Sequence, residues 1–131
     1  MDIRWDHERE RRTGIPEIIF GRGKTVAQVV RLFEEAVRSG QLRLATQLPD
    51  PHLEALRDLA TVHEESRTAV VNPRPLRDLP AIGLLTGGTG DIPVLLEAQA
   101  VLTALGFPSK SFFDVGVAGL HRLQGVLEEI R

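Results

Sequence analysis

The chain has 131 residues, with 16 lysines and arginines against 18 aspartates and glutamates, a formal net charge of −2 and no cysteine. This length suits one ordinary domain or two small ones, and the charge lacks the basic block of a general nucleic-acid or membrane surface. The missing cysteine excludes disulfides, thiolate metal sites and cysteine nucleophiles within these residues, and since no apolar run approaches the roughly 20 residues of a membrane helix we expect a cytoplasmic protein.

The first half of the chain predicts a small α/β unit. Residues 2–13 are densely charged with both signs, which is typical of a solvated helix, although their arginines also suit an anion. The clearest helix is 25–39, because Thr25 and Gln28 form a capping box and Gly40 ends it. The other predicted elements are strands at 15–20, 42–46 and 68–71, a turn at 21–24, and a helix from Asp50. The expected inward side chains are Val26, Val29, Val30, Phe33 and Val37 on the first helix and Leu53, Leu56 and Leu59 on the second.

A boundary follows, because three prolines fall within the nine residues 72–80. We therefore divide the chain into an N-terminal unit, 1–78, and a second unit, 79–131. The second unit predicts a strand at 81–86 covered on both faces, a strand at 109–115, and helices after Asp91 and at 119–131. Strand, helix, strand and helix with short links indicate parallel βαβ pairing, so the fold class is α/β. The expected inward residues are Val94, Leu95, Ala98, Val101, Leu102 and Leu105 on one helix and Leu120, Leu123, Leu127 and Ile130 on the other.

The second unit supplies only two strands and ends inside an amphipathic helix. A two-stranded parallel sheet cannot cover its own apolar faces, so it must add strands from the first unit, pair with another chain, or be incomplete. We interpret this unit as an incomplete αβα domain. We expect its apolar patch to make the chain oligomeric, aggregation-prone or loosely packed there.

The glycine-rich loop between the first strand and helix of this unit is the leading candidate site. Its small residues allow a ligand to approach the backbone, while Thr89 offers a hydroxyl and Asp91 a carboxylate; the loop also contains Gly88 and Gly90. A tight turn with Asp91 as the helix N-cap explains much of the same pattern. The sheet context favours a site, because ligands of open α/β sheets bind at the carboxyl ends of strands.

The loop after the second strand brings His121 and Arg122 to the first turn of the last helix. A helix start disfavours the charged form of histidine, which suits a neutral proton shuttle, and a structural or surface histidine is the equal alternative. No histidine or carboxylate spacing in the sequence indicates a metal site.

Four motifs follow one another along the chain: the run from Asp6 to Glu17 with Arg9, Arg12, Gly14 and Pro16, then Phe20 to Thr25, then Gly88 to Pro93, and finally Asp114 to Leu123. In this order they resemble the LarB family, which makes the nickel-pincer nucleotide cofactor and whose second domain is similar to the aminoimidazole ribonucleotide carboxylases. The resemblance implies an αβα carboxylase-like fold that commonly assembles as an octamer.

The resemblance also implies an activity: a carboxylase and hydrolase that adds a carboxyl group from CO2 or bicarbonate to pyridinium carbon 5 of nicotinic acid adenine dinucleotide and releases AMP. By the same resemblance, Gly88, Thr89, Gly90, Asp91 and Arg122 would bind the nucleotide and its phosphates, with His121 as the catalytic candidate. Arg22 and Lys24 would add anion contacts, and Mg²⁺ is compatible with such a ligand.

The chain departs from the family in ways that bear on catalysis. The family uses a cysteine thiolate as covalent activator, and this sequence has none; Gly90 stands where the family has serine. The later family motifs are absent, so we interpret the chain as the N-terminal half of a LarB-like enzyme, truncated and inactive alone. The alternatives are a non-catalytic nucleotide-binding or assembly module and a relative of the purine carboxylases.

Overall fold

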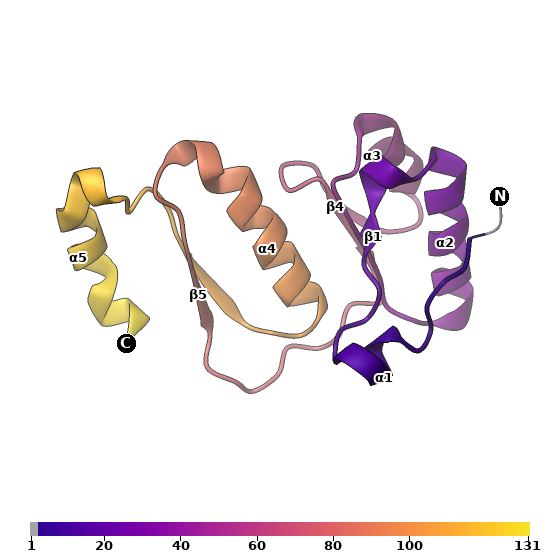
Figure 1. The fold of residues 1–131 in the computed structure, drawn as a ribbon, viewed down its shortest axis with the longest axis horizontal. Coiled ribbons are helices and arrows are strands. Elements are labelled where there is room, and N and C mark those ends of the chain that lie inside the picture. The colour runs from indigo at the N-terminus through magenta and orange to yellow at the C-terminus, as the bar shows by residue number, and fades with distance from the viewer. Residues whose placement is uncertain (1–2) are drawn as a thin grey trace. The chain divides into compact units, whose positions relative to one another are not determined.

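The computed structural model describes residues 3–131 and has an α/β fold in two compact units, one extending to Asn72 and the other beginning at Pro73 (Figure 1). The predicted charged helix was expected to start at residue 2, which lies outside the described residues. Helix α1 is shorter than predicted, Arg9–Thr13, and Gly14 ends it with a left-handed backbone at φ 79°. None of the helices in residues 3–131 is long and apolar enough to cross a membrane.

The first unit is built on a four-stranded mixed sheet in the order β1-β2-β4-β3. Strands β1 (Ile19–Phe20) and β2 (Arg43–Thr46) are parallel, while β4 (Thr68–Val71) pairs antiparallel with both β2 and β3 (Thr61–His63). The other elements are the 3-10 helix η1 (Gly21–Gly23) and helices α2 (Val26–Ser39) and α3 (Asp50–Leu56). The strand predicted at 15–20 is therefore limited to its last two residues, and β3 was not predicted.

Helix α2 begins and ends as its sequence dictates. Thr25 Oγ1 accepts the Gln28 N–H at 3.2 Å, Gln28 Oε1 accepts the Thr25 N–H at 2.9 Å, and Gly40 closes the helix at φ 69°. The buried face is displaced from the predicted one, since Leu32 and Ala36 are buried whereas Val37 is 49% exposed. The prediction for Val37 was wrong because the face toward the sheet centres on Leu32 and Phe33.

The first unit has its own apolar core. The residues fully buried in it are Ile19, Val29, Leu32, Phe33, Ala45, Leu48, Leu53, Leu56 and Ala69. Beside this core lies an unusual group: the Arg43 side chain is 1% exposed, its Nε donates to the Leu32 carbonyl at 3.1 Å, and its guanidinium lies 3.8 Å from the centre of the Trp5 ring. The N-terminal segment therefore covers a buried cation.

The second unit is a parallel strand pair with helices. Strand β5 (Ile82–Leu85) pairs with β6 (Ser109–Phe112) in the register Ile82 to Ser109 and Leu85 to Phe112, as a sheet separate from that of the first unit. Helix α4 (Ile92–Ala104) connects the two strands, and α5 (Leu120–Ile130) follows β6; the short 3-10 helices η2 (Thr89–Asp91) and η3 (Val117–Gly119) precede them. The parallel pairing predicted for this half is thus present.

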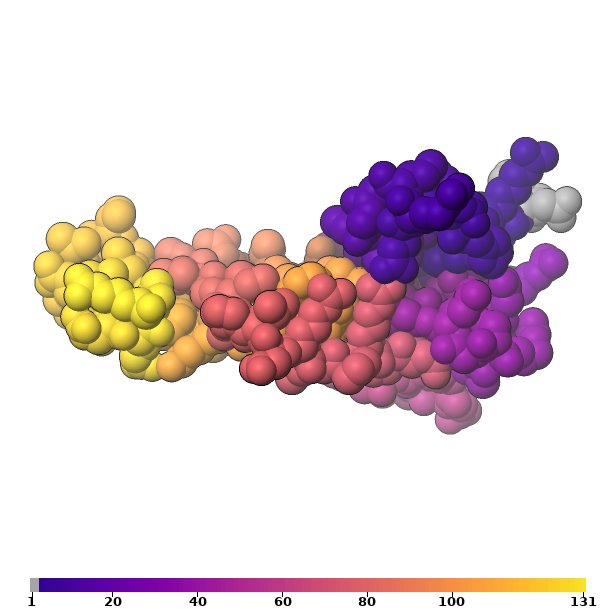
Figure 2. All heavy atoms as spheres, turned by 90° about the horizontal axis from the view of Figure 1, so that it is seen from below, coloured from indigo at the N-terminus to yellow at the C-terminus, as the bar shows by residue number. Residues whose placement is uncertain are grey.

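The apolar residues of the second unit are covered less than predicted. Strand β5 leaves Ile82 and Leu85 exposed, so it is not covered on both faces, and Val94 of α4 is 69% exposed. Helix α5 contains no buried residue, and Leu120, Leu127 and Ile130 are exposed. Its yellow atoms lie at the surface in Figure 2. The expectation that these side chains point inward was therefore wrong within this chain, whereas the exposure of apolar side chains expected for this half is present.

Candidate functional site

The two candidate loops meet at the carboxyl edge of the β5–β6 pair. Thr86, the residue after β5, links them: its N–H donates to the Phe112 carbonyl at 3.0 Å, and its own carbonyl accepts the Val115 N–H at 2.9 Å. Its hydroxyl accepts the Asp114 N–H at 2.9 Å, and the residue is only 4% exposed. Thr86 therefore fixes the second loop against the first.

One glycine, Gly116, allows the loops to touch. A Cβ at Gly116 would lie 2.2 Å from the Gly87 carbonyl oxygen, a distance that a side chain does not tolerate, and 3.2 Å from the Gly87 Cα. Gly116 has φ −67°, so it is required for space and not for backbone conformation. The structure thus brings together the two segments that the sequence proposed as one site.

The first loop leads directly into a helix. Gly88 is extended, Thr89 and Asp91 lie in η2, and α4 starts at Ile92 without a break. Asp91 occupies the N-cap position but its side chain makes no capping hydrogen bond, because its backbone is already helical at φ −91° and ψ −1°. Asp91 therefore stands at the N-cap position that the sequence indicates, but its exposed carboxylate makes no capping hydrogen bond.

The second loop places its two functional candidates differently. His121 is exposed on the first turn of α5. Arg122 is held by Asp114, since Nη1 donates to Oδ2 at 2.5 Å. Asp114 has a left-handed backbone at φ 53°, a conformation that aspartate and asparagine adopt more readily than most residues. The sequence named Asp114 only as the first residue of the fourth motif and gave it no role, because neither its positive φ nor its pairing with Arg122 leaves a periodic signal.

Arg22 and Lys24 belong to the first unit and not to the loops of the second. Arg22 lies in η1, and the Lys24 carbonyl accepts a hydrogen bond from His52 Nε2 at 2.7 Å. His52 is itself buried, and its Nδ1 has no hydrogen-bond partner among the described residues. His52 therefore fixes the turn that carries Lys24, a role that the sequence did not indicate.

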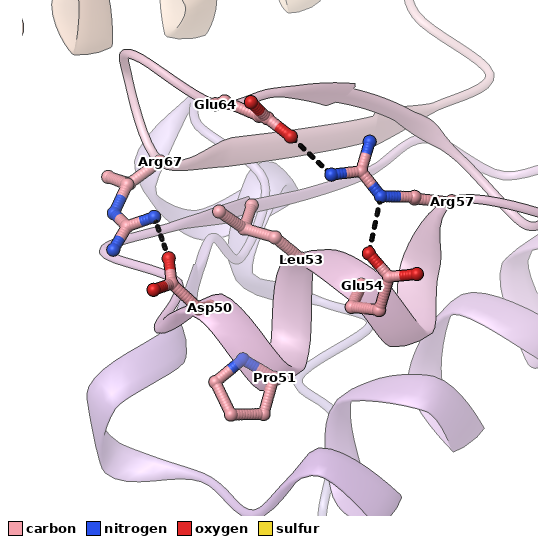
Figure 3. Close-up of a pocket in the computed structure, with 7 residues that line it drawn as sticks. All are labelled: Asp50, Pro51, Leu53, Glu54, Arg57, Glu64 and Arg67. Carbon is pink, nitrogen blue, oxygen red and sulfur yellow. Dashed lines mark hydrogen bonds and ion pairs between the residues drawn. The ribbon is translucent and has the colours of Figure 1, made fainter.

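A charged hollow of about 420 Å³ opens between α3 and the β3–β4 turn (Figure 3). Arg57 bonds to Glu54 at 2.7 Å and also to Glu64, and Arg67 pairs with Asp50. The hydrogen bonds that Arg57 donates to Glu64 and Glu54 raise the pKa of Arg57 above its ordinary value. Since the carboxylates in this hollow already engage both arginines, the hollow is a surface ion-pair network.

A second ion-pair cluster holds the N-terminal motif. Asp6 receives hydrogen bonds from Arg12 through both Nη atoms, at 3.1 and 2.5 Å, and a longer one from Arg9. The hydrogen bond from Arg12 lowers the pKa of Asp6. The Asp6 N–H donates to Glu17 Oε2 at 2.7 Å. In the same unit, burial of the Arg43 side chain lowers the pKa of that arginine. The motif thus ties the N-terminal segment to the sheet.

Within residues 3–131, no group of three or more histidine, aspartate or glutamate side chains is arranged to hold a metal ion.

Two comparisons place the chain among known proteins. The LarB/PurE-like N-terminal domain matches residues 2–74. An uncharacterized protein of Methanocaldococcus jannaschii is 29% identical over 140 aligned positions, which cover 98% of this chain and 54% of that protein. The chain therefore spans about half the length of the curated relative that it matches.

Proposed function

The chain belongs to the LarB/PurE-like N-terminal domain family, and from this premise we propose that the loops of its second unit bind the nucleotide of a LarB-type reaction. In that reaction a carboxyl group from CO2 or bicarbonate is added to pyridinium carbon 5 of nicotinic acid adenine dinucleotide, and cleavage of the phosphoanhydride releases AMP. The ligand class is thus a dinucleotide or its AMP half.

The observation that supports this proposal best is the contact between Gly87 and Gly116. It joins the loops that follow two parallel strands, at the edge where α/β sheets bind ligands. The backbone around Gly88 and Gly90 is open, because a Cβ at either glycine would meet no atom within 4 Å. A phosphate can therefore approach the backbone N–H groups there closely.

Each side chain at this edge has a role in the proposal. The Thr89 hydroxyl and the Asp91 carboxylate contact the nucleotide, the first as a donor to phosphate and the second as an acceptor from a ribose hydroxyl or through Mg²⁺. Arg122 neutralises phosphate. Exposed His121 lies beside it on the first turn of α5, and we assign it to proton transfer in the LarB-type reaction and not to the binding that this chain performs alone. Arg22 and Lys24 are separate candidates for anion contact within the first unit.

The proposal assigns binding, and not the covalent step, to this chain. The family resemblance requires a thiolate that adds to the pyridinium ring, and the 131 residues contain no cysteine. We therefore expect the chain to bind AMP and nicotinic acid adenine dinucleotide without turnover of either.

Isothermal titration calorimetry with both nucleotides tests the proposal. Thr89→Val should weaken AMP binding by about tenfold or more, the loss of one hydrogen bond to a charged group. The matched control is Thr103→Val, which makes the same exchange at an exposed position of α4 and should leave the dissociation constant unchanged. Absence of binding heat with the wild-type chain, or equal effects of the two variants, would overturn the proposal.

The second candidate function is assembly, which the exposed apolar face of α5 favours. An exposed row such as Leu120, Leu127 and Ile130 drives association of copies. Sedimentation velocity separates the candidates: an assembly module associates, loses association in a Leu127→Ser/Ile130→Ser variant, and gives no heat with nucleotide. A wild-type monomer at all concentrations would exclude assembly.

A further inference from the structure

Residues 74–79, which follow the boundary, are fastened to the second unit, and we call them the strap. The Arg74 N–H donates to the Ala104 carbonyl at 2.9 Å, and the Arg77 N–H donates to the Gly106 carbonyl at 2.8 Å. Ala104 is the last residue of α4 and is only 1% exposed, so its carbonyl is one of the helix-end groups that need a partner from outside the helix. The strap therefore completes the C-terminal end of α4.

The turn after α4 is shaped to receive the strap. Gly106 has a left-handed φ of 87°, and a Cβ there would lie 2.6 Å from the Pro75 carbonyl oxygen, so only glycine permits this approach. The Arg77 guanidinium lies 4.6 Å from the centre of the half-buried Phe107 ring, which is a cation–π distance. Backbone and side-chain contacts thus hold the strap on the second unit together.

The last residue of the first unit is held just as firmly by its own unit. Asn72 follows β4, and its Nδ2 donates to the Ala36 carbonyl at 3.0 Å and to the Gln41 carbonyl at 2.9 Å. Its backbone is left-handed at φ 51°, a conformation that asparagine adopts more readily than most residues. Only Pro73 therefore separates this anchored residue from the anchored N–H of Arg74.

Few backbone rotations remain between these two anchors. The peptide bonds on both sides of Pro73 are planar, and the pyrrolidine ring fixes the φ of Pro73 at about −65°. A proline also restricts the ψ of the residue before it, which here is Asn72. The ψ of Pro73 is therefore the backbone torsion that stays free to rotate between the anchored residues.

We propose that the chain bends between its two units at a single joint, the ψ torsion of Pro73, and that the strap moves with the second unit as a part of it. The prolines of the connection then have different roles, because Pro73 is the joint whereas Pro75 lies within the strap. Motion between the units is rotation of rigid bodies about one bond, as at a hinge, and not the free movement of a flexible tether. This device is independent of nucleotide binding, since none of its residues belongs to the candidate loops.

Hydrogen exchange of the full chain, resolved amide by amide with NMR, tests the strap. The N–H groups of Arg74 and Arg77 should exchange at least about tenfold more slowly than in an unstructured chain, because exchange requires the strap to lift from α4. Gly106→Ala should abolish this protection, since its Cβ displaces the Pro75 carbonyl. The control Gly14→Ala alters a glycine of similar φ, 79°, where a Cβ meets no atom within 4 Å, and should leave both amides protected. Unprotected amides in the wild-type chain, or equal effects of the two variants, overturn the proposal.

Residual dipolar couplings of the full chain in a weakly aligning medium test the joint, because they give the degree of alignment of each unit separately. Pro73→Gly frees the φ of residue 73 and the ψ of Asn72, so the two degrees of alignment should differ more than in the wild type. Pro75→Gly is the matched control: it makes the same exchange at an exposed position within the strap and should keep the wild-type ratio. Any other pattern, including equal effects of the two substitutions, overturns the single joint.

Discussion

Substituting Gly116 by alanine tests whether contact between the two loops organises the second unit. The added Cβ would lie 2.2 Å from the Gly87 carbonyl oxygen and 3.0 Å from the carbonyl carbon. These are backbone atoms, so a change of side-chain rotamer cannot relieve the clash. The loops must separate by about 0.8 Å to restore even the shortest tolerated approach of 3.0 Å.

The cost follows from what that separation disturbs. The Val115 N–H and the Asp114 N–H both bond to Thr86 at 2.9 Å, and both bonds bridge the loops that must part. Overpacking of one methyl group against fixed atoms costs about 1–3 kcal/mol, and we expect about 2 kcal/mol here. Alanine adopts the φ of −67° at this position freely, so the effect is one of space alone.

Hydrogen exchange followed by mass spectrometry measures the effect unit by unit. Peptides from 82–115 should exchange roughly 30-fold faster in Gly116→Ala, the equivalent of about 2 kcal/mol. Peptides from the first unit should be unchanged. The control is Gly88→Ala, where a Cβ meets no atom within 4 Å and the backbone is extended. Equal protection in the two variants would refute the loop contact.

Three further predictions concern the first unit. Trp5→Leu uncovers Arg43 and should lower the free energy of unfolding in urea by about 1–3 kcal/mol, and an unchanged value would show that Trp5 does not shield the cation. Arg12 lowers the pKa of Asp6, so the Asp6 carboxylate contributes to the free energy of unfolding above the ordinary aspartate pKa of 3.8, and this contribution is lost as the pH falls through the lower native pKa. Asp6→Asn should therefore reduce the slope of the free energy of unfolding against pH on the acid side. A variant that keeps the wild-type slope contradicts this prediction. Thr25→Ala removes the capping box of α2 and should lower the free energy of unfolding, measured in urea or by heating, by about 1 kcal/mol. An unchanged free energy of unfolding would show that the capping box does not stabilise α2.

The sequence predicted elements best where one local rule decided the outcome. The helix at 25–39 is delimited by a capping box and a glycine, and the structure keeps both within one residue. Strand β3 was missed because Thr61–His63 is short and largely exposed at the sheet edge, so its residues show no buried alternation. Only its antiparallel pairing with β4 makes it a strand, and pairing with a partner is not a local property.

Burial in the second unit could not be predicted from apolar pattern alone. Helix α4 is apolar on nearly all sides, so periodicity does not distinguish its packed face from its exposed one; Leu95 is buried while the adjacent Val94 is exposed. The candidate site shows the same limit. The glycines in the sequence predicted where the loops lie. The pairing of Arg122 with Asp114, however, depends on the left-handed backbone at Asp114, which no residue pattern specifies.

The residues that the family model matches and the loops to which we assign nucleotide binding lie in different units. The residues of the first motif, Asp6 to Glu17, bond mainly to one another: the Asp6 carboxylate accepts hydrogen bonds from Arg9 and Arg12, and the Asp6 N–H donates to Glu17. These bonds give the charged residues of the motif a structural role, which is to hold the N-terminal segment against the first unit. The family match ends at residue 74, beside the boundary after Asn72, so it covers this self-contained unit and little else. The family match therefore assigns the first unit to a known domain family. It does not test substrate recognition, which has to be tested by substitutions in the loops of the second unit, at Thr89, Asp114 and Arg122.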